Sequence, residues 1–279
     1  YQANIGLIPA IADRHTLIFS DKLNHASIID GIKLSGAKHY RYKHNNTEDL
    51  LFLLKKHKAS NSRKIIISET LFSMDGDFCQ LESLIKLSKE YDTLLYIDDA
   101  HGSGISGTKG IGICENHFKQ IDIYMGTFGK AHGSFGAYCC CSTQMKKFLI
   151  NKLRTLIFST GLPPAILATN KESINLIIAA DKKRVKLNEN INILRDFLKK
   201  NNFKTIASNS PVIPIIIGDE QDTLSLSHYL KDHGIIATAI RPPTVPENTA
   251  RIRFTMTSEH SQADINLLTT SLTKWQSQC

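Results

Sequence analysis

The sequence contains no apolar run of about 18 residues, the length that a helix needs to cross a membrane. Its start shows no basic leader followed by an apolar core, so no secretory signal is expected. No CxxC pair is present, which argues against a zinc knuckle or a dithiol redox motif. No stripe of basic and aromatic residues indicates nucleic-acid binding. We therefore expect a cytoplasmic protein that binds neither a membrane nor a nucleic acid.

The 279 residues are 42% hydrophobic and 22% charged, a composition typical of a globular protein with one or two domains. The net charge of +8 favours anionic partners in general, but the lysines are scattered and indicate a solvated surface. Three of the six cysteines are adjacent in "AYCCCS", residues 137–142, which is typical of a buried strand. The first residue is Tyr1 rather than Met, so we expect a fragment or a processed chain.

Short apolar runs alternate with helical patterns in the first half of the chain. Continuous apolar runs suit strands that are buried on both faces, as in a parallel sheet. The helical pattern that begins at Thr47 has acids at its start and lysines at its end, as the helix dipole prefers, and Thr47 is its expected cap. This order predicts a doubly wound α/β sheet. The expected strands are 15–21, 64–70, 93–99 and 121–128, and the helices between them are 47–57 and 80–92.

The second half of the chain has a different character. Residues 165–200 contain no Gly or Pro and predict a long helix. Three strands and two more helices follow, which predict a second, smaller α/β domain. We expect a large domain over residues 1–182 and a small one over 183–279. The strands are expected at 210–219, 234–242 and 250–257, and the helices at 221–234 and 261–276.

Polar residues follow four of the strands expected in the first half. In open α/β sheets, ligands bind beyond the carboxyl ends of the strands, so these residues should meet at one edge. This convergence predicts a functional site more strongly than any single motif does. The residues are His25 after the first run, Ser73 after the second, Asp98, Asp99 and His101 at the third, and Thr127 with Lys130 after the fourth.

The stretch "YIDDAHGSGISG", residues 96–107, permits three interpretations. Its glycines match G-x-G-x-x-G, but the residues that follow, "TKGIGICEN", do not favour the helix that a dinucleotide site requires. Asp98, Asp99 and His101 suggest a metal, yet neighbouring strand residues point in opposite directions, so a metal site is disfavoured. The third interpretation depends on Lys130.

Lys130 lies in "TFGKAHGSFGA", residues 127–137, at the end of a strand and between glycines. A surface position is the default for a lysine. A lysine at a strand end can also form a Schiff base with an aldehyde cofactor. A pyridoxal phosphate site needs in addition a carboxylate for the ring nitrogen, a group that stacks on the ring and donors for the phosphate. The residues at the other strand ends can supply all of these.

These residues identify a resemblance to the α-oxoamine synthases, pyridoxal-phosphate enzymes with the aminotransferase fold (fold type I). The motifs that carry it are "LNHAS", "ETLFSMDGD", "YIDDAHGSG", "TFGKAHGSFGA", "IFSTGLPPA" and "TAIRPPTVPENTARIRFTMT", which extend from about residue 22 to 260. "RPPTVP" favours the branch whose product is 8-amino-7-oxononanoate, in biotin biosynthesis. Chains of this family begin well upstream of the residue that matches Tyr1, so this chain resembles the family without its N-terminal part.

The resemblance implies four catalytic residues. Lys130 should hold the cofactor as a Schiff base and move the substrate proton. Asp98 should contact the pyridinium nitrogen, since an opposite charge keeps that nitrogen protonated. His101 should donate to the phenolic oxygen, and His25 should stack on the ring close to the substrate.

It also implies further contacts with the cofactor. Ser73 and Thr127 should hydrogen-bond it, Thr127 at the phosphate. Tyr1 matches the residue after a glycine in a phosphate-binding turn. Ser159 and Thr160 should approach the phosphate of a neighbouring subunit's cofactor, although the two residues could simply cap a turn.

Two residues near the end of the chain should bind the substrates. Arg253 should pair with the amino acid's carboxylate in a fork that lysine cannot copy. Thr244 should line the entrance for the acyl substrate. Arg251 is expected at the surface. His132 and Asn46 depart from the family's pattern and are given no role.

The implied reaction is the decarboxylative condensation of L-alanine with a pimeloyl thioester, carried by coenzyme A or acyl carrier protein. A homodimer with its active site at the subunit interface is expected. The alternatives are a sister α-oxoamine synthase of the glycine C-acetyltransferase or 5-aminolevulinate synthase type, and an incomplete fragment or non-catalytic partner subunit. Non-catalytic partners in this family lack the lysine, so Lys130 argues against the last of these.

Overall fold

The computed structural model describes residues 1–277, so Cys279 lies outside the described residues. The chain divides into two compact units. The large unit comprises Tyr1–Phe72 and Cys79–Ala180, and the small unit comprises Ser73–Phe78 and the residues from Asp181 onward. Each unit is described by itself.

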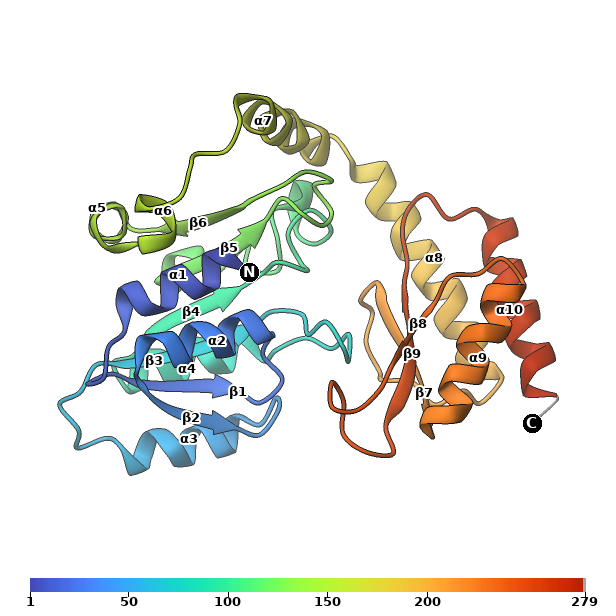
Figure 1. Ribbon diagram of the computed structural model, residues 1–279, viewed down its shortest axis with the longest axis horizontal. Coiled ribbons are helices and arrows are strands. Elements are labelled where there is room, and N and C mark those ends of the chain that lie inside the picture. Colours follow the sequence, from blue (N-terminus) through green and yellow to red (C-terminus); the bar gives the residue numbers. More distant parts are fainter. Residues whose placement is uncertain (278–279) are drawn as a thin grey trace. The chain divides into compact units, whose positions relative to one another are not determined.

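The large unit is built on one six-stranded sheet (Figure 1). Its strand order is β2-β1-β3-β4-β5-β6, and all neighbouring strands are parallel except the β5–β6 pair. The predicted fold class, an α/β fold with a mostly parallel sheet, is therefore confirmed. The strands are β1 (Leu17–Asp21), β2 (Lys38–Tyr42), β3 (Lys64–Glu69), β4 (Leu94–Asp98), β5 (Ile123–Thr127) and β6 (Ala137–Cys141).

Helices cover both faces of this sheet. Because successive strand residues point to opposite faces, Ile65 and Ile67 pack on one side with α1 and α2, and Ile66 packs on the other with α3 and α4. Leu84 and Ile85 of α4 are buried in this second cluster. The helices of the large unit are α1 (Gln2–Ile11), α2 (Ala26–Ser35), α3 (Thr47–Lys56), α4 (Leu81–Glu90), α5 (Thr143–Lys152), α6 (Arg154–Ile157) and α7 (Pro164–Ile178), with short 3-10 turns η1 (Thr108–Gly110) and η2 (Phe118–Gln120).

Two expectations for this unit were wrong. Thr47 is not the cap of α3 but its first residue, and the Asn46 side chain accepts the N–H of Asp49 at 2.8 Å. The cysteine run forms β6, an edge strand rather than a buried one, and Cys140 is exposed. An edge strand has a paired neighbour on one side alone, which the apolar pattern did not reveal.

The small unit packs helices against a three-stranded antiparallel sheet of order β7-β9-β8. The long helix expected over residues 165–200 is two helices, because α7 ends before Ala179 and α8 begins at Asp181. The elements of the small unit are α8 (Asp181–Lys200), β7 (Val212–Gly218), α9 (Glu220–Asp232), β8 (Thr238–Ile240), β9 (Ala250–Thr255) and α10 (Gln262–Gln276).

The loop Ser73–Phe78 follows β3 in sequence but belongs to the small unit. Its Gly76 has a φ of +70°, and a Cβ there would lie 2.1 Å from the carbonyl oxygen of Val212. That carbonyl group belongs to β7, so the loop lies directly against the small sheet. Only glycine fits so close an approach with this backbone conformation.

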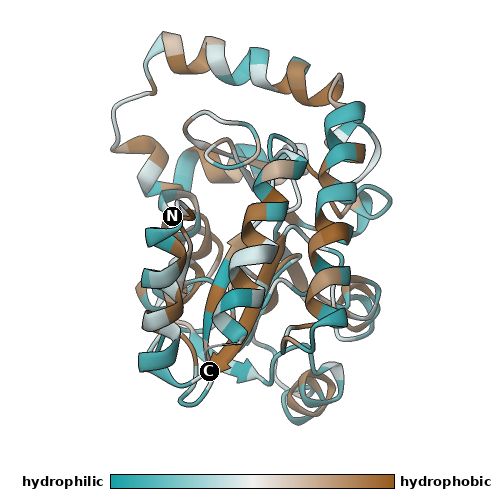
Figure 2. Ribbon diagram, turned by 90° about the vertical axis from the view of Figure 1, so that its right-hand side faces the viewer, coloured by the Kyte–Doolittle hydropathy of each residue, from teal (hydrophilic) through white to brown (hydrophobic). Residues whose placement is uncertain are grey.

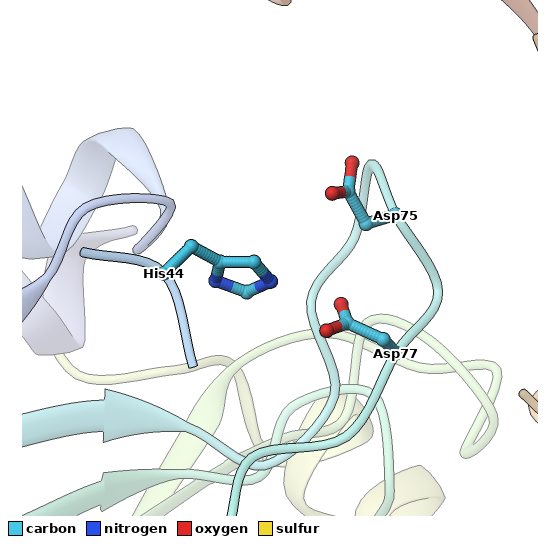
Figure 3. Close-up of side chains that lie close together, drawn as sticks. All are labelled: His44, Asp75 and Asp77. Carbon is cyan, nitrogen blue, oxygen red and sulfur yellow. The ribbon is translucent and has the colours of Figure 1, made fainter. Parts of the chain in front are cut away.

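Arg251 of β9 is buried, not at the surface as expected. Its Nη1 lies 2.5 Å from Asp75 Oδ1 on the 73–78 loop. Figure 3 labels Asp75 and Asp77, which both belong to this loop, and His44, which belongs to the large unit. Because His44 belongs to the large unit and both aspartates to the small one, no metal site is assigned to the three.

The helices carry alternating hydrophilic and hydrophobic bands, and the strands are largely hydrophobic (Figure 2). This is the pattern of amphipathic helices that pack on a buried sheet. Within residues 1–277, no helix combines the length and the apolar character that spanning a membrane requires.

Candidate active site

Three neighbouring parallel strands of the large unit end in polar residues at the same edge of the sheet. They are Glu69 of β3, Asp98 of β4 and Thr127 of β5. Glu69 and Asp98 stand opposite each other in the register, and Asp98 pairs with Met125, two residues before Thr127. The edge that the sequence predicted from its strand ends is thus present.

Asp98 is a buried carboxylate with two donors. Asn4 Nδ2 donates to its Oδ2 at 2.8 Å, and the N–H of Ala100 donates to its Oδ1 at 2.9 Å. Burial raises the pKa of Asp98, while these two donors and the positive charges of Lys130 and His25 lower it. A further positive charge at this carboxylate would favour its ionised form.

His25 is the N-cap residue of α2, and a network of donors fixes its ring. Its Nδ1 accepts the N–H of Ser27 at 3.2 Å and lies 2.8 Å from Ser27 Oγ. Since Nδ1 accepts, the neutral ring carries its proton on Nε2. Partial burial is the main cause that lowers the pKa of His25; Asp98 raises it and Lys130 lowers it.

Lys130 is exposed just beyond β5. Its charge acts on His25, Asp98 and Glu69, so the structure brings together three of the four residues predicted to be catalytic, Lys130, His25 and Asp98. Thr127 Oγ1 donates to the carbonyl oxygen of Gly136 at 3.0 Å and accepts the N–H of Gly129 at 3.1 Å. Thr127 therefore shapes the turn that presents Lys130. His101 is half-buried and lies three residues beyond the end of β4.

Asp99 points away from Asp98, into the protein. It accepts hydrogen bonds from Thr70, from Tyr124 Oη at 2.9 Å and from the N–H of Ile113 at 3.0 Å. Burial raises the pKa of Asp99 to about 6. A Cβ on Gly102 would lie 2.1 Å from its Oδ1, so this glycine makes room for the carboxylate. The segment 102–107 forms turns and bends and leads into the three-residue 3-10 turn η1 rather than an α-helix, in agreement with the rejection of the dinucleotide interpretation.

Sequence reasoning missed two residues of the site, Asn4 and Glu69. Asn4, on the buried face of α1, joins three groups: it donates to Asp98 and Ser27 and accepts the hydroxyl of Tyr96 at 2.5 Å. Glu69 is buried beside Asp98. The sequence did contain a signal for Glu69: it is the last residue of an apolar strand, and the neighbouring strand also ends in an acidic residue, Asp98.

Three of the other predicted residues lie in less enclosed positions of the large unit. Tyr1 is the N-cap of α1, and its hydroxyl donates to Asp30. Ser159 and Thr160 are exposed between α6 and α7. The first backbone amides of α1 and the hydroxyls of Ser159 and Thr160 are groups that suit an anion such as a phosphate. Their predicted contacts stay predictions.

Ser73, Thr244 and Arg253 belong to the small unit. Arg253 Nη1 donates to the carbonyl oxygen of Ser73 at 3.2 Å. Its Nε is buried and has no hydrogen-bond partner among the described residues, which fits a guanidinium that binds a carboxylate. Thr244 is exposed in a turn, and its N–H donates to the carbonyl oxygen of Arg241 at 3.0 Å.

A cavity of about 1180 Å³ in the large unit is lined by none of these residues. Tyr124, Tyr138 and His132 line it. Ser103 Oγ lies 3.1 Å from His132 Nε2 and 2.5 Å from Tyr138 Oη. Aromatic rings also surround the imidazole of His132, so this residue has a packing role in the wall of the cavity.

The profile of one protein family, "Aminotransferase class I and II", matches residues 1–272. The chain belongs to this family. A relative named 8-amino-7-oxononanoate synthase, from Geotalea daltonii, is 44% identical over 270 residues, 95% of this chain and 69% of the relative. A relative from Geobacillus kaustophilus, whose name gives the same synthase provisionally, is 44% identical over 271 residues, 96% of this chain and 69% of the relative.

Two solved structures share the fold. Serine palmitoyltransferase from S. paucimobilis, with PLP and myriocin bound, superposes with a TM-score of 0.94 at 28% identity, over 99% of this chain and 70% of that one. The 8-amino-7-oxononanoate synthase of Francisella tularensis gives a TM-score of 0.85 at 29% identity, over 99% of this chain and 79% of that one. This chain thus has fold type I and is of the α-oxoamine synthase type, and it spans about 69% of the length of its relatives.

The residues at the sheet edge fit pyridoxal phosphate. The buried carboxylate of Asp98 suits a cationic ring nitrogen, because burial disfavours its charge and a cation restores it. A lysine and an imidazole with a fixed tautomer lie within electrostatic range of that carboxylate. This donor set is the one that the cofactor's ring and aldehyde require.

Proposed function

We propose that this chain carries the pyridoxal phosphate site of an 8-amino-7-oxononanoate synthase, which condenses L-alanine with a pimeloyl thioester. The observation that carries the proposal is that His25 is joined to Asp98 through Ser27 and Asn4, while Lys130 follows the neighbouring strand β5 at the same edge of the sheet. The substrate assignment is supported by relatives that are 44% identical and bear the synthase's name.

Bound at this edge, pyridoxal phosphate would supply an electron-withdrawing ring that stabilises negative charge at the Cα of the amino acid. Asp98 would accept the ring's N–H and hold its positive charge, since Asn4 and Ala100 already orient the carboxylate. Lys130 would hold the aldehyde carbon and later take the Cα proton on its Nζ and return it.

The two histidines and Arg253 would orient the reactants. His25 would stack on the ring, because its imidazole is fixed by Ser27 and lies beside the same carboxylate. His101 would donate to the phenolic oxygen. Arg253 would bind the carboxylate of L-alanine. Such positioning can supply a large share of the rate enhancement through effective molarity.

Further assignments belong to the same proposal. Ser73, Thr127 and Tyr1 would contact the cofactor, and Thr244 would line the acyl entrance. Ser159 and Thr160 would reach the phosphate of the neighbouring subunit in a cytoplasmic homodimer.

The decisive experiment is a visible spectrum of the purified chain with added pyridoxal phosphate. The wild type should show the absorption band of a protonated Schiff base, and Lys130→Ala should lose it. Lys146→Ala changes an exposed lysine of α5 and should keep the band. An equal band in Lys130→Ala, or no band in the wild type, would contradict the proposal.

Substrate tests separate this synthase from its sisters. L-alanine should change the spectrum more than glycine or L-serine does. The similarity to serine palmitoyltransferase makes L-serine the important comparison. A larger response to glycine or serine would assign the chain to a sister enzyme. Pimeloyl thioesters of coenzyme A and of acyl carrier protein, offered with L-alanine, would then identify the carrier.

A further inference from the structure

We propose that Glu69 is a positioning residue that holds His25 and Asp98 in their working arrangement, an inference that rests on the proposed function. Glu69 is the last residue of β3 and is 3% exposed. Its parallel register partner is Asp98, which is 4% exposed. Side chains of register partners on neighbouring parallel strands lie side by side, so two buried carboxyl groups share this edge.

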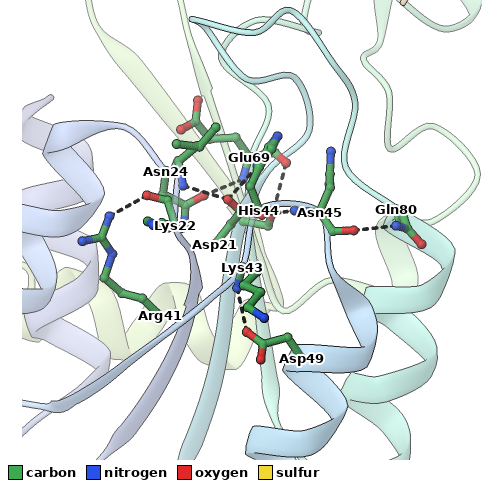
Figure 4. Close-up of polar contacts among 12 residues, drawn as sticks. Asp21, Lys22, Asn24, Arg41, Lys43, His44, Asn45, Asp49, Glu69 and Gln80 are labelled. Atoms are coloured by element: carbon green, nitrogen blue, oxygen red, sulfur yellow. Dashed lines mark hydrogen bonds and ion pairs between the residues drawn. The ribbon is translucent and has the colours of Figure 1, made fainter. Parts of the chain in front are cut away.

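Glu69 contacts the main chain of His25. Its Oε1 accepts the N–H of His25, at the point where the chain enters α2. Asn24, the residue before His25, makes two hydrogen bonds with β3. Its Nδ2 donates to the carbonyl oxygen of Ile67 at 2.9 Å, and its Oδ1 accepts the N–H of Glu69 at 3.3 Å. Figure 4 shows Asn24 and Glu69 within this network. Three hydrogen bonds therefore fix the backbone that carries the imidazole.

A second set of hydrogen bonds joins the ring of His25 to Asp98. Ser27 Oγ lies 2.8 Å from His25 Nδ1, and Asn4 Nδ2 donates both to Ser27 Oγ, at 2.9 Å, and to Asp98. Glu69 provides a second connection between these two residues, because it accepts the N–H of His25 and is the register partner of Asp98 in the sheet. Glu69 is the acceptor for the N–H of His25. Without it, the main chain of His25 would lose this hydrogen bond.

The charges around Glu69 favour its neutral form. Burial raises the pKa of Glu69 well above its ordinary range, and the neighbouring Asp98 and Asp21 raise it further. The N–H of His25 and the charge of Lys130 act in the opposite direction. Asp98 has two donors of its own, so it is the better place for the single negative charge of the pair. A neutral Glu69 still accepts the N–H of His25 through its carbonyl oxygen.

This arrangement predicts a clear difference between two variants. Glu69→Gln keeps the shape, the neutral charge and an acceptor oxygen, whereas Glu69→Ala removes the acceptor. In the cofactor-free chain, Glu69→Ala should speed amide hydrogen exchange of His25 about tenfold or more and shift the NMR titration of its imidazole. With pyridoxal phosphate, it should raise the dissociation constant about tenfold. Glu69→Gln should stay within about twofold in each measurement.

Controls keep the test decisive. Glu82→Ala changes an exposed glutamate on α4 and should change none of the three quantities. If Glu69→Ala does not fold, Glu69→Asp takes its place, since the shorter side chain cannot reach the same N–H. Unchanged exchange and cofactor binding in a folded Ala or Asp variant would overturn the proposal. So would a Gln variant as impaired as Ala, because the ionised carboxylate would then be what matters.

The measurements also separate this inference from the proposed function. Exchange and titration of His25 are made without cofactor, so they report on Glu69 even if the chain binds no pyridoxal phosphate. A chain without the Schiff-base band but with faster exchange in Glu69→Ala would reject the proposed function and retain the positioning of His25.

Discussion

The side chain of Asn4 donates to Asp98 Oδ2 over 2.8 Å, although 94 residues separate the two in sequence. The same amide group donates to Ser27, and its oxygen accepts the hydroxyl of Tyr96. One carboxamide at the start of α1 thus connects β4, which contains Asp98 and Tyr96, with the first turn of α2, whose N-cap is His25. A buried polar group with three partners is costly to remove, because each partner then loses its hydrogen bond.

We expect Asn4→Ala to lower the free energy of unfolding of the large unit by about 2 kcal/mol. The substitution also removes a donor that lowers the pKa of Asp98, so that pKa should rise further. Urea unfolding measures the first effect, and the pH dependence of cofactor binding measures the second. Asn151→Ala, on the exposed side of α5, is the matched control. Equal free energies of unfolding for the two variants would show that the hydrogen bonds of Asn4 do not stabilise the large unit.

Asp99 should make the stability of the large unit depend on pH in the acidic range. Its pKa is about 6 in the folded protein, against about 3.9 in an exposed aspartate. The folded state therefore binds the proton more tightly, and stability falls as the pH rises from about 4 to about 6. Relative to Asp99→Asn, the wild type should lose up to about 3 kcal/mol over this window.

Chemical unfolding of both proteins at several pH values measures this difference. Tyr124→Phe removes a donor that lowers the pKa of Asp99, so it should move the upper end of the window to higher pH. Parallel pH profiles for the wild type and Asp99→Asn would contradict the prediction.

The cap of α3 can be tested with two adjacent substitutions. Asn46→Ala removes the oxygen that accepts the N–H of Asp49 and should cost about 1 kcal/mol. Thr47→Ala changes the first helical residue, whose side chain is not the cap, and should cost much less. Urea unfolding compares the two, and a larger loss for Thr47→Ala would restore Thr47 as the cap.

The buried ion pair between Arg251 and Asp75 should show strong coupling in a double-mutant cycle. Arg251→Met leaves a partly buried carboxylate without its cation and should destabilise the small unit by about 3 kcal/mol. With Asp75→Asn, the coupling energy should reach about 2 kcal/mol. The exposed pair of Lys183 and Glu259 is the control and should show much weaker coupling. Additive effects at Arg251 and Asp75 would mean that the pair contributes nothing of its own.

The sequence missed β2 but predicted the other five strands of the large sheet and the edge at which polar residues end three of them. Both follow from local patterns, because a strand buried on both faces reads as one apolar run and parallel strands place their carboxyl ends together. It did not predict α1, and it assigned the cap of α3 to Thr47 instead of Asn46. The choice between Asn46 and Thr47 depends on which backbone amide each side chain reaches, and both residues are common caps.

The residues that support the site were harder to find. Asn4 lies on an apolar helix face, and nothing near it in sequence indicates that it meets Asp98. Arg251 alternates with apolar residues in β9, a pattern that equally suits an exposed strand, and its burial depends on an aspartate that is 176 residues away. Such contacts are set by tertiary packing, which residue spacing does not encode.

The loop Ser73–Phe78 means that the small unit is assembled from two stretches of the chain. A polypeptide cut at the main division, residues 181–279, would keep the guanidinium of Arg251 but lose the aspartate that neutralises it. It would also lose the carbonyl group of Gly76 that Ser208 and Ser210 bind, each at 2.5 Å. The residues from Asp181 onward are therefore not the whole of the small unit. Any attempt to express it separately, or to exchange it with that of a relative, must carry this six-residue loop along.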